Sequence, residues 1–499
     1  MLRLRRQADV KPTPLFWVAL IAGLLGCQRH YPEGGYSCSL PQRPGDCPPG
    51  WYCRSDLHCY SSPDEAGATT DAGAIDAARV DASEPGDAGP PHDAWSSSDV
   101  GLDARECAAE TCDGVDNDCD GRVDEGIATV SPPHYFPITG YGLSIVPTQT
   151  GWGVLYEDAS NITNGAPYWV VVNAAGDPML PVSLGSDFVG AMFGRASGDT
   201  VVMATASCVI FSFMSPPACT DTLRVFRQSN GTRIAPPGTA PYVFQAANPM
   251  GAVGLGAVDT TRVSVYQGYG TTTPFTLRRY RMSLDRSTPS IAAMLDVAQV
   301  PDGDWAVTVA GSDEVVAVPS SAGLQLYLTP SRDSAITASA LGPLTDLPTD
   351  VREPLAVSVP DPSMPISGAN PLAIAMMRPR PNGIVVALVT GTTPLSYLTP
   401  VSLPGSAGGN LYTSVRIVAA GGPGTPRFYI AALDDAGGNN TTLRAWELVA
   451  GDTTARMLPI ADDWIAVRNR LDMAFAGGTV RILEDDDSSQ IVTRTIGCH

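Results

Sequence analysis

The sequence predicts a mainly β protein whose large C-terminal part, residues 130–499, is a β-propeller of about seven blades. First, this part contains roughly two dozen short runs of β-branched and aromatic residues, each bounded by Gly, Pro, Asp or Asn. Tyr168–Val172 and Ile384–Leu388 are examples. Second, no amphipathic helical stretch of more than about two turns interrupts them. Third, the segment is too long for one β-sandwich, and four-stranded blades of about 45 to 55 residues divide it into seven, give or take one. Two sandwiches or a β-helix are the alternatives.

A weak internal repeat supports the propeller. Three pairs of segments resemble the inner two strands of blades, although no WD or kelch signature appears. The pairs are Gly190–Phe193 with Val201–Ala204, Asp304–Val307 with Glu314–Ala317, and Val415–Val418 with Arg427–Ile430.

Residues 1–26 are expected to be a bacterial lipoprotein signal peptide. Basic residues precede an apolar run from Leu15 to Leu25, which is shorter than the roughly 20 residues that a membrane span needs. The run ends in Leu24-Leu25-Gly26-Cys27, which resembles the lipobox. This resemblance implies cleavage before Cys27 and acylation of its sulfur, which anchors the exported chain in a membrane. Because Gln28 is not the aspartate that retains lipoproteins at the inner membrane, we expect the outer membrane, with the periplasmic and cell-surface faces both open.

Residues 27–60 predict a small disulfide-rich module, and residues 61–105 a disordered acidic linker. The module holds Cys38, Cys47, Cys53 and Cys59, and its sequence resembles cysteine-rich knots near the N-termini of myxobacterial lipoproteins. Two bridges would replace a core that so short a segment cannot form, whereas the cysteine spacings fit no common zinc template. The linker is rich in Asp, Ala, Ser, Pro and Gly, and like charges keep it extended.

Residues 106–128 contain a candidate metal-binding loop, CDGVDNDCDGRVDEG, from Cys112 to Gly126. Three aspartates at alternate positions can face one point, and Gly121 permits the sharp reversal that follows. The loop is not an EF-hand, because the twelfth position counted from Asp116 is Ile127 instead of glutamate. The candidate ligands are Asp116, Asp118, Asp120, the carbonyl of Arg122, Asp124 and Glu125.

The loop resembles the calcium loops of thrombospondin type-3 repeats, and more closely the motif repeated in bacterial surface proteins of the MopE type. The resemblance covers about twenty residues and implies metal binding in a secreted protein. We expect Ca²⁺, because the donors are hard oxygens and the loop lacks the His and Met that copper prefers. Copper capture and a bare acidic turn are the alternatives.

Export predicts that the ten cysteines besides Cys27 form disulfides in an oxidising compartment. The spacing of Cys112 and Cys119 suits a bridge across the metal loop, and Cys208 and Cys219 suggest a bridged hairpin. Cys107 and Cys498 remain, and a bond between them would join the two ends of the large domain. The connectivity of the N-terminal module stays open.

The large domain lacks the residues for several kinds of catalysis. No histidine lies between Tyr135 and Cys498, and the only lysine is Lys11, which excludes a Ser-His-Asp triad and a Schiff base. The acidic clusters Asp434-Asp435, Asp462-Asp463 and Glu484–Asp487 are expected to be mostly solvated turns, and the strand tryptophans to pack in the core.

These observations predict a non-enzymatic binding or scaffold module at the outer membrane, with a protein or polysaccharide ligand. The net charge of −20 disfavours nucleic acid. A carboxylate-dependent polysaccharide hydrolase is the alternative, because paired carboxylates remain available. The oligomeric state is left open.

Overall fold

The computed structural model divides into two compact units, Met1–Val100 and Gly101–His499. In the first unit it describes β1 (Tyr52–Cys53) and β2 (Cys59–Tyr60), an antiparallel pair in which Cys53 lies opposite Cys59. The described residues of the second unit are 128–148, 151–158, 166–173, 176–185, 191–209, 218–235, 242–248, 253–259, 261–269, 274–284, 290–300, 305–320, 323–330, 338–344, 347, 352–379, 382–403, 411–420, 425–435, 441–460, 465–466, 471–476, 479–485 and 489–497.

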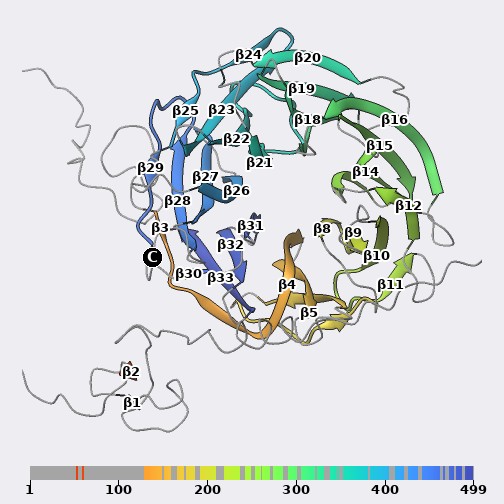
Figure 1. The fold of residues 1–499 in the computed structure, drawn as a ribbon, viewed down its shortest axis with the longest axis vertical. Helices are drawn as coiled ribbons and strands as arrows, with labels where there is room; N and C mark the ends of the chain where they lie inside the picture. Colours follow the sequence, from red (N-terminus) through yellow and green to blue (C-terminus); the bar gives the residue numbers. More distant parts are fainter. Residues whose placement is uncertain are drawn as a thin grey trace, which may run out of the picture. The chain divides into compact units, whose positions relative to one another are not determined.

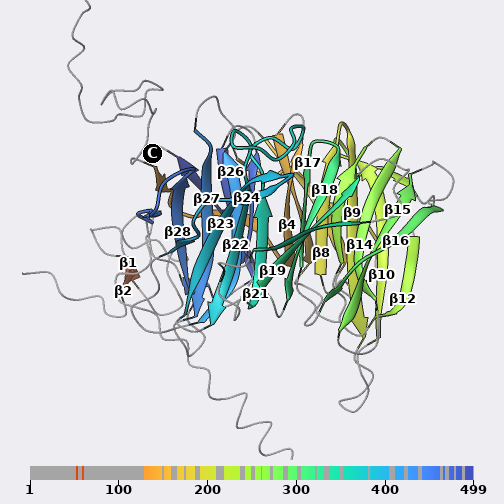
Figure 2. The same cartoon turned by 90° about the horizontal axis from the view of Figure 1, so that it is seen from above.

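The described residues of the second unit form a ring of antiparallel sheets, so the predicted mainly β propeller is confirmed (Figure 1). Seen from the side, the strands of neighbouring sheets stand next to one another around the ring (Figure 2). Among the described residues, every regular element is a strand, and no helix has the length and hydrophobicity to cross a bilayer.

Five sheets of four or five strands follow one another along the chain. Sheet 1 contains β8 (Ala191–Ser197), β9 (Thr200–Val209), β10 (Ala218–Arg227), β11 (Arg233–Ala235) and β12 (Tyr242–Asn248). Sheet 2 contains β13 (Val253–Val258), β14 (Arg262–Tyr269), β15 (Phe275–Ser283) and β16 (Ser290–Val300). Sheet 3 contains β17 (Ala306–Ala310), β18 (Asp313–Ser320), β19 (Gly323–Pro330) and β20 (Ser339–Leu344). Sheet 4 contains β21 (Arg352–Ser358), β22 (Leu372–Pro379), β23 (Asn382–Thr392), β24 (Leu395–Tyr397) and β25 (Val401–Ser402). Sheet 5 contains β26 (Leu411–Ala420), β27 (Arg427–Asp435), β28 (Thr441–Val449), β29 (Arg456–Met457) and β30 (Ile465–Ala466).

The remaining eight strands form one shared sheet that brings the two ends of the domain together. Its members are β3 (Thr129–Val130), β4 (His134–Thr148), β5 (Gly151–Asp158), β6 (Pro167–Val172), β7 (Val182–Ser183), β31 (Leu471–Ala476), β32 (Thr479–Asp485) and β33 (Gln490–Gly497). The first half of β4 pairs with β33, where Tyr135 faces Val492, and its second half pairs with β5, where Ile145 faces Val154. Since β3 also pairs with β33, the first and last strands of the domain close the ring.

The hydrophobic core consists of several clusters, which lie between neighbouring sets of strands around the ring. Seven strands of the described residues, β4, β8, β13, β17, β21, β26 and β31, surround the centre, each in contact with the next and β31 in contact with β4. The buried apolar side chains gather into clusters that lie between neighbouring sets, such as the one that joins sheets 4 and 5 around Phe428 and Trp446. Burial of this kind, at about 25 cal/mol per Å² of apolar surface, stabilises the ring only when adjacent sets pack together.

The three predicted strand pairs are confirmed as the inner two strands of single sheets. They form β8 with β9, β17 with β18, and β26 with β27. The first two pairs turn through two-residue loops that begin with Gly198 and Gly311, at φ of 59° and 64°. Glycine adopts this positive φ without strain, which explains the residue at each tight turn.

Candidate functional site

The polar groups at the centre of the ring connect neighbouring innermost strands. An innermost strand has one edge without a strand partner, so its backbone groups need other partners. Side chains of adjacent strands supply them. Ser144 Oγ accepts from Gly194 N at 3.3 Å, Arg195 Nη1 donates to Gly256 O at 2.9 Å, and Ser358 Oγ accepts from Ala419 N at 3.0 Å.

Asp472 of β31 joins three innermost strands where the ring closes. Its Oδ2 accepts from Ile145 N of β4 at 2.8 Å, and its Oδ1 accepts from Arg416 Nε of β26 at 3.2 Å. Burial raises the pKa of Asp472, while the charge of Arg416 and the hydrogen bonds oppose this shift. The carboxylate therefore holds the strands together.

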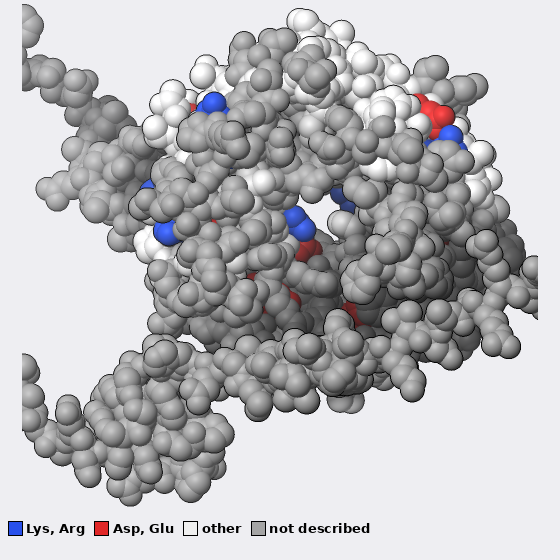
Figure 3. All heavy atoms as spheres, viewed as in Figure 1, with Lys and Arg blue, Asp and Glu red and all other residues white. Residues whose placement is uncertain are grey.

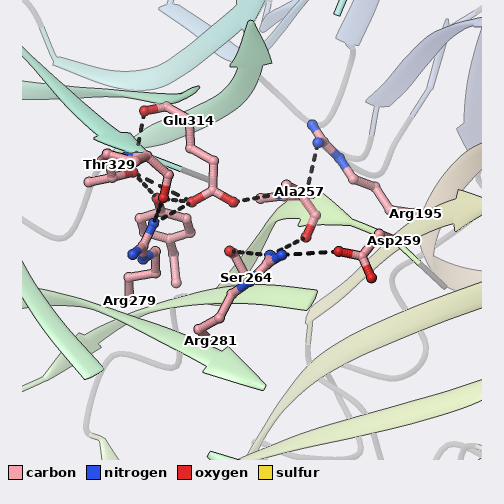
Figure 4. A network of polar contacts seen from close by, with 11 residues as sticks. Arg195, Ala257, Asp259, Ser264, Arg279, Arg281, Glu314 and Thr329 are labelled. Atoms are coloured by element: carbon pink, nitrogen blue, oxygen red, sulfur yellow. Dashed lines mark hydrogen bonds and ion pairs between the residues drawn. The ribbon is translucent and has the colours of Figure 1, made fainter. Parts of the chain in front are cut away.

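A second polar network lies between sheets 2 and 3 and centres on Glu314, which is fully buried in β18 (Figure 4). Glu314 Oε2 accepts from the Tyr266 hydroxyl at 2.6 Å and from Arg279 Nη1 at 3.2 Å, and Oε1 accepts from Ala257 N at 2.7 Å. Burial and the adjacent carboxylate raise the pKa of Tyr266 well above its usual value, so the phenol stays a neutral donor. The Glu314 carboxylate therefore accepts from three donors that lie on three strands of sheet 2.

Gly256 leaves the space that this carboxylate occupies. A Cβ at this position would lie 2.7 Å from Glu314 Oε1 and 2.9 Å from the Tyr266 ring. The network was not anticipated from the sequence, although the Gly254-Leu255-Gly256 stretch inside a strand is a signal of close approach.

Two more arginines belong to the same network. Arg281 donates to Ser264 Oγ at 3.0 Å and to Asp259 Oδ2 at 3.1 Å, and Arg195 donates to Gly256 O. The network therefore contains three arginines, Arg195, Arg279 and Arg281, and two carboxylates (Figure 4). Basic and acidic side chains are also visible at the edge of the central opening in the space-filling view (Figure 3).

The expectation that the acidic clusters are mostly solvated turns is wrong for Asp434, Glu484 and Asp485, which are buried. Asp434 pairs with Arg444 at 3.3 Å, and Glu484 with Arg494 at 2.7 Å. The first pair joins β27 to β28, and the second joins β32 to β33. In each pair the two residues lie diagonally across the ladder and are ten residues apart in the sequence. This repeated acidic–arginine spacing is the sequence signal that could have identified them.

Most of the predicted site residues lie outside the described residues. This holds for the lipidation site Cys27, for the metal ligands Asp116, Asp118, Asp120, Arg122, Asp124 and Glu125, and for Cys38, Cys47, Cys107, Cys112, Cys119 and Cys498. Within the described part of the chain, no three His, Cys, Asp or Glu side chains gather as a metal site.

The backbone register brings one predicted cysteine pair together. Cys208 of β9 lies directly opposite Cys219 of β10. Opposed residues in an antiparallel ladder have Cα atoms about 4.5 to 5.5 Å apart, within the range that a disulfide spans. The bridge itself stays a prediction. Trp152 and Trp169 are buried as expected, and Trp169 Nε1 donates to Gln228 O at 2.9 Å.

No protein-family model and no curated protein sequence matches the chain. Solved propellers resemble it in fold. The six-bladed fucose-recognising lectin of Aleuria aurantia has 11% identity and a TM-score of 0.37, over 66% of this chain and 98% of that chain. The N11 neuraminidase-like protein of A/flat-faced bat/Peru/033/2010 (H18N11) has 8% identity and a TM-score of 0.35, over 74% and 94%.

A Trypanosoma rangeli sialidase has 8% identity and a TM-score of 0.37, over 72% of this chain and 53% of the sialidase chain. This chain therefore spans about half of the sialidase. Likeness of this size concerns the fold, and the ligands of these proteins are not assigned to the chain.

Proposed function

We propose that this protein is a non-enzymatic binding or scaffold module, a rigid propeller that an acylated Cys27 and an acidic linker hold at the outer membrane. Its ligand would be a protein or a polysaccharide. The observation that carries this proposal is that, among the described residues, five carboxylates whose side chains are at most 20% exposed pair with arginine. These are Glu314 with Arg279, Asp434 with Arg444, Glu447 with Arg456, Asp472 with Arg416, and Glu484 with Arg494.

Such pairing favours a structural role for these carboxylates. A general acid must deliver its proton to a substrate, and a nucleophile needs an exposed oxygen. An arginine partner instead occupies the carboxylate oxygens and fixes the carboxylate in one position. The pairs connect strands within and between sheets. They therefore favour a stiff binding platform as the function, in preference to hydrolysis of polysaccharides.

We infer that the platform has seven blades. Sheets 1 to 5 supply five, and the shared sheet supplies two, because β4 serves as an outer strand beside β33 and as an innermost strand beside β5. The seven innermost strands of the described residues and their closed order of contacts support this count.

The absence of hydrolysis is tested by incubating the full chain with a panel of neutral and acidic polysaccharides. We expect retention of the protein on its ligand without release of reducing ends. The variant Asp472→Asn serves as the comparison, because it changes the carboxylate at the centre of the ring. Release of reducing ends by the wild-type protein that this variant loses would show catalysis and refute the proposal.

The proposed anchoring rests on the lipobox-like sequence before Cys27. We expect the full chain in the outer-membrane fraction of expressing cells, since acyl chains hold a protein there without a helix. Cell fractionation with a Cys27→Ala variant tests this, because the variant should leave that fraction.

We further propose that the loop from Cys112 to Gly126 binds a structural Ca²⁺. The donor set fits this ion, because carboxylate and carbonyl oxygens suit calcium and disfavour copper. The chain that follows the loop is fixed to the propeller. Val130 is fully buried and its N donates to Pro459 O at 2.9 Å, while the Ala128 carbonyl accepts from Arg456 at 3.1 Å. An ion in the loop would therefore stiffen a segment that belongs to the closure of the ring.

Removal of calcium should lower the melting temperature of the purified protein. Free energy of metal binding adds to folding free energy when the site exists only in the folded chain. Thermal unfolding with and without a chelator measures the effect, and a double Asp118→Asn, Asp120→Asn variant should lose it. A chelator that leaves the melting temperature unchanged would contradict the calcium site, and elemental analysis without added metal distinguishes copper.

A further inference from the structure

We propose that Arg195 binds the carboxylate group of a small acidic ligand, such as a sugar acid, at the central opening of the propeller. This inference rests on the proposed binding function and names the chemistry of one ligand group. It uses residues that the sequence did not single out.

The position of Arg195 makes its guanidinium available. Arg195 lies on β8, one of the innermost strands, and is half-buried, so it is held by protein and still reaches solvent. Among the described residues, its one hydrogen bond runs from Nη1 to Gly256 O at 2.9 Å (Figure 4). That contact orients the guanidinium and leaves its Nε and Nη2 donors for another partner.

Among the carboxylates of the described residues, none forms an ion pair with Arg195. Arg279 pairs with Glu314, and Arg281 pairs with Asp259. Glu314 attracts Arg195 electrostatically, but its oxygens already accept from Ala257, Tyr266 and Arg279. An anion bound beside Arg195 would neutralise the third positive charge of the network.

Burial makes that anion favourable. Desolvation lowers the pKa of Arg195, although a guanidinium stays protonated in proteins. The partly desolvated charge therefore raises the free energy of the empty site, and a bound carboxylate offsets this cost.

The geometry and the net charge select the kind of anion. The Nε and Nη2 groups of a guanidinium form a planar fork that matches the two oxygens of a carboxylate. A polyanion would meet the field of a chain with net charge −20, whereas a single carboxylate meets little electrostatic repulsion. A small monoacid is therefore the ligand class that fits.

Saturation-transfer NMR of the full chain tests the proposal with sodium galacturonate as the probe and galactose as its neutral counterpart. Wild-type protein should bind galacturonate at least about tenfold more tightly than galactose, since the fork contributes a charge-assisted pair of hydrogen bonds. Arg195→Gln should remove this preference. Arg195→Lys, which keeps the charge without the fork, should retain only part of it.

The control variant is Arg227→Gln, which breaks an exposed pair with Asp199 and should bind like the wild type. Thermal melting of each variant checks that it is folded. Equal galacturonate binding by wild type and Arg195→Gln, the absence of binding by the wild type, or displacement of galacturonate by an equal concentration of sodium sulfate would overturn the carboxylate site. Conversion of galacturonate in the same spectra would instead refute the non-enzymatic function, so the two failures are distinguishable.

Discussion

Glu314→Ala should destabilise the propeller by about 3–5 kcal/mol, the cost of breaking a buried ion pair on one side. The substitution leaves Arg279, the Tyr266 hydroxyl and Ala257 N without their shared acceptor in a site closed to water. It also creates a cavity between sheets 2 and 3. Urea unfolding followed by tryptophan fluorescence measures the change, provided that the transition is cooperative in both proteins.

The matched control is Asp296→Ala, which removes the carboxylate of an ion pair at the surface. Asp296 accepts from Arg278 Nε at 2.5 Å, and its side chain is 57% exposed. Water can replace the lost contact, so the loss should stay below about 1 kcal/mol. Similar losses for the two alanine variants would show that burial does not decide the strength of the Glu314 network. Glu314→Gln, which keeps the shape and part of the hydrogen bonding, should fall between them.

The strands were predictable from the sequence because their signal is local. Runs such as Glu314–Ala317 carry β-branched residues over a few positions, and a glycine marks the tight turn before them. The ring followed from the number of strands, since sheets that bury both faces need neighbours on each side. The dual use of β4 was not predicted, because nothing within His134–Thr148 marks the point where one pairing partner replaces another.

The polar centre was less predictable, because it depends on residues far apart in sequence. Asp472 contacts a backbone group 327 positions earlier, and Glu314 reaches a backbone group 57 positions earlier. Such contacts depend on how the sheets pack, which no local pattern encodes. The pairs of Asp434 with Arg444 and Glu484 with Arg494 are the exception, because a hairpin alone brings residues ten apart to a diagonal position.

Asp221→Asn should stabilise the protein at pH 8. Asp221 is fully buried in β10 and accepts a hydrogen bond from Gln267 Nε2 of β14, while its Oδ1 and the Gln267 Oε1 are both buried acceptors without a partner. A proton on Asp221 would let the carboxyl donate to Gln267, and both acceptors would be satisfied. Burial raises the pKa of Asp221 to about 7, and the hydrogen bond from Gln267 opposes the shift.

The direction of the change in stability with pH follows from the pKa of Asp221 in the folded and in the unfolded chain. The unfolded chain has an aspartate pKa of about 3.9, so between about pH 4 and pH 7 the folded protein binds more protons than the unfolded chain. The free energy of unfolding therefore falls as pH rises through this window. The asparagine side chain of the variant is neutral at every pH, and its amide can donate to Gln267 Oε1. We expect the variant to gain on the order of 2 kcal/mol over wild type at pH 8 and little at pH 4.

Urea unfolding at several pH values between 4 and 8 measures this slope. Asp259→Asn is the control, because this substitution should change the stability in the opposite direction. Burial acts to raise the pKa of Asp259, but hydrogen bonds from Thr261 and Arg262 and the charge of Arg281 outweigh it and lower the pKa. The ionised form of Asp259 is therefore the stabilising one, and Asp259→Asn should lose stability above the unfolded pKa. If Asp221→Asn lost stability at pH 8 as well, the ionised carboxylate would be the form that stabilises the folded protein, and the raised pKa of Asp221 and the protonated Asp221–Gln267 pair would both be wrong.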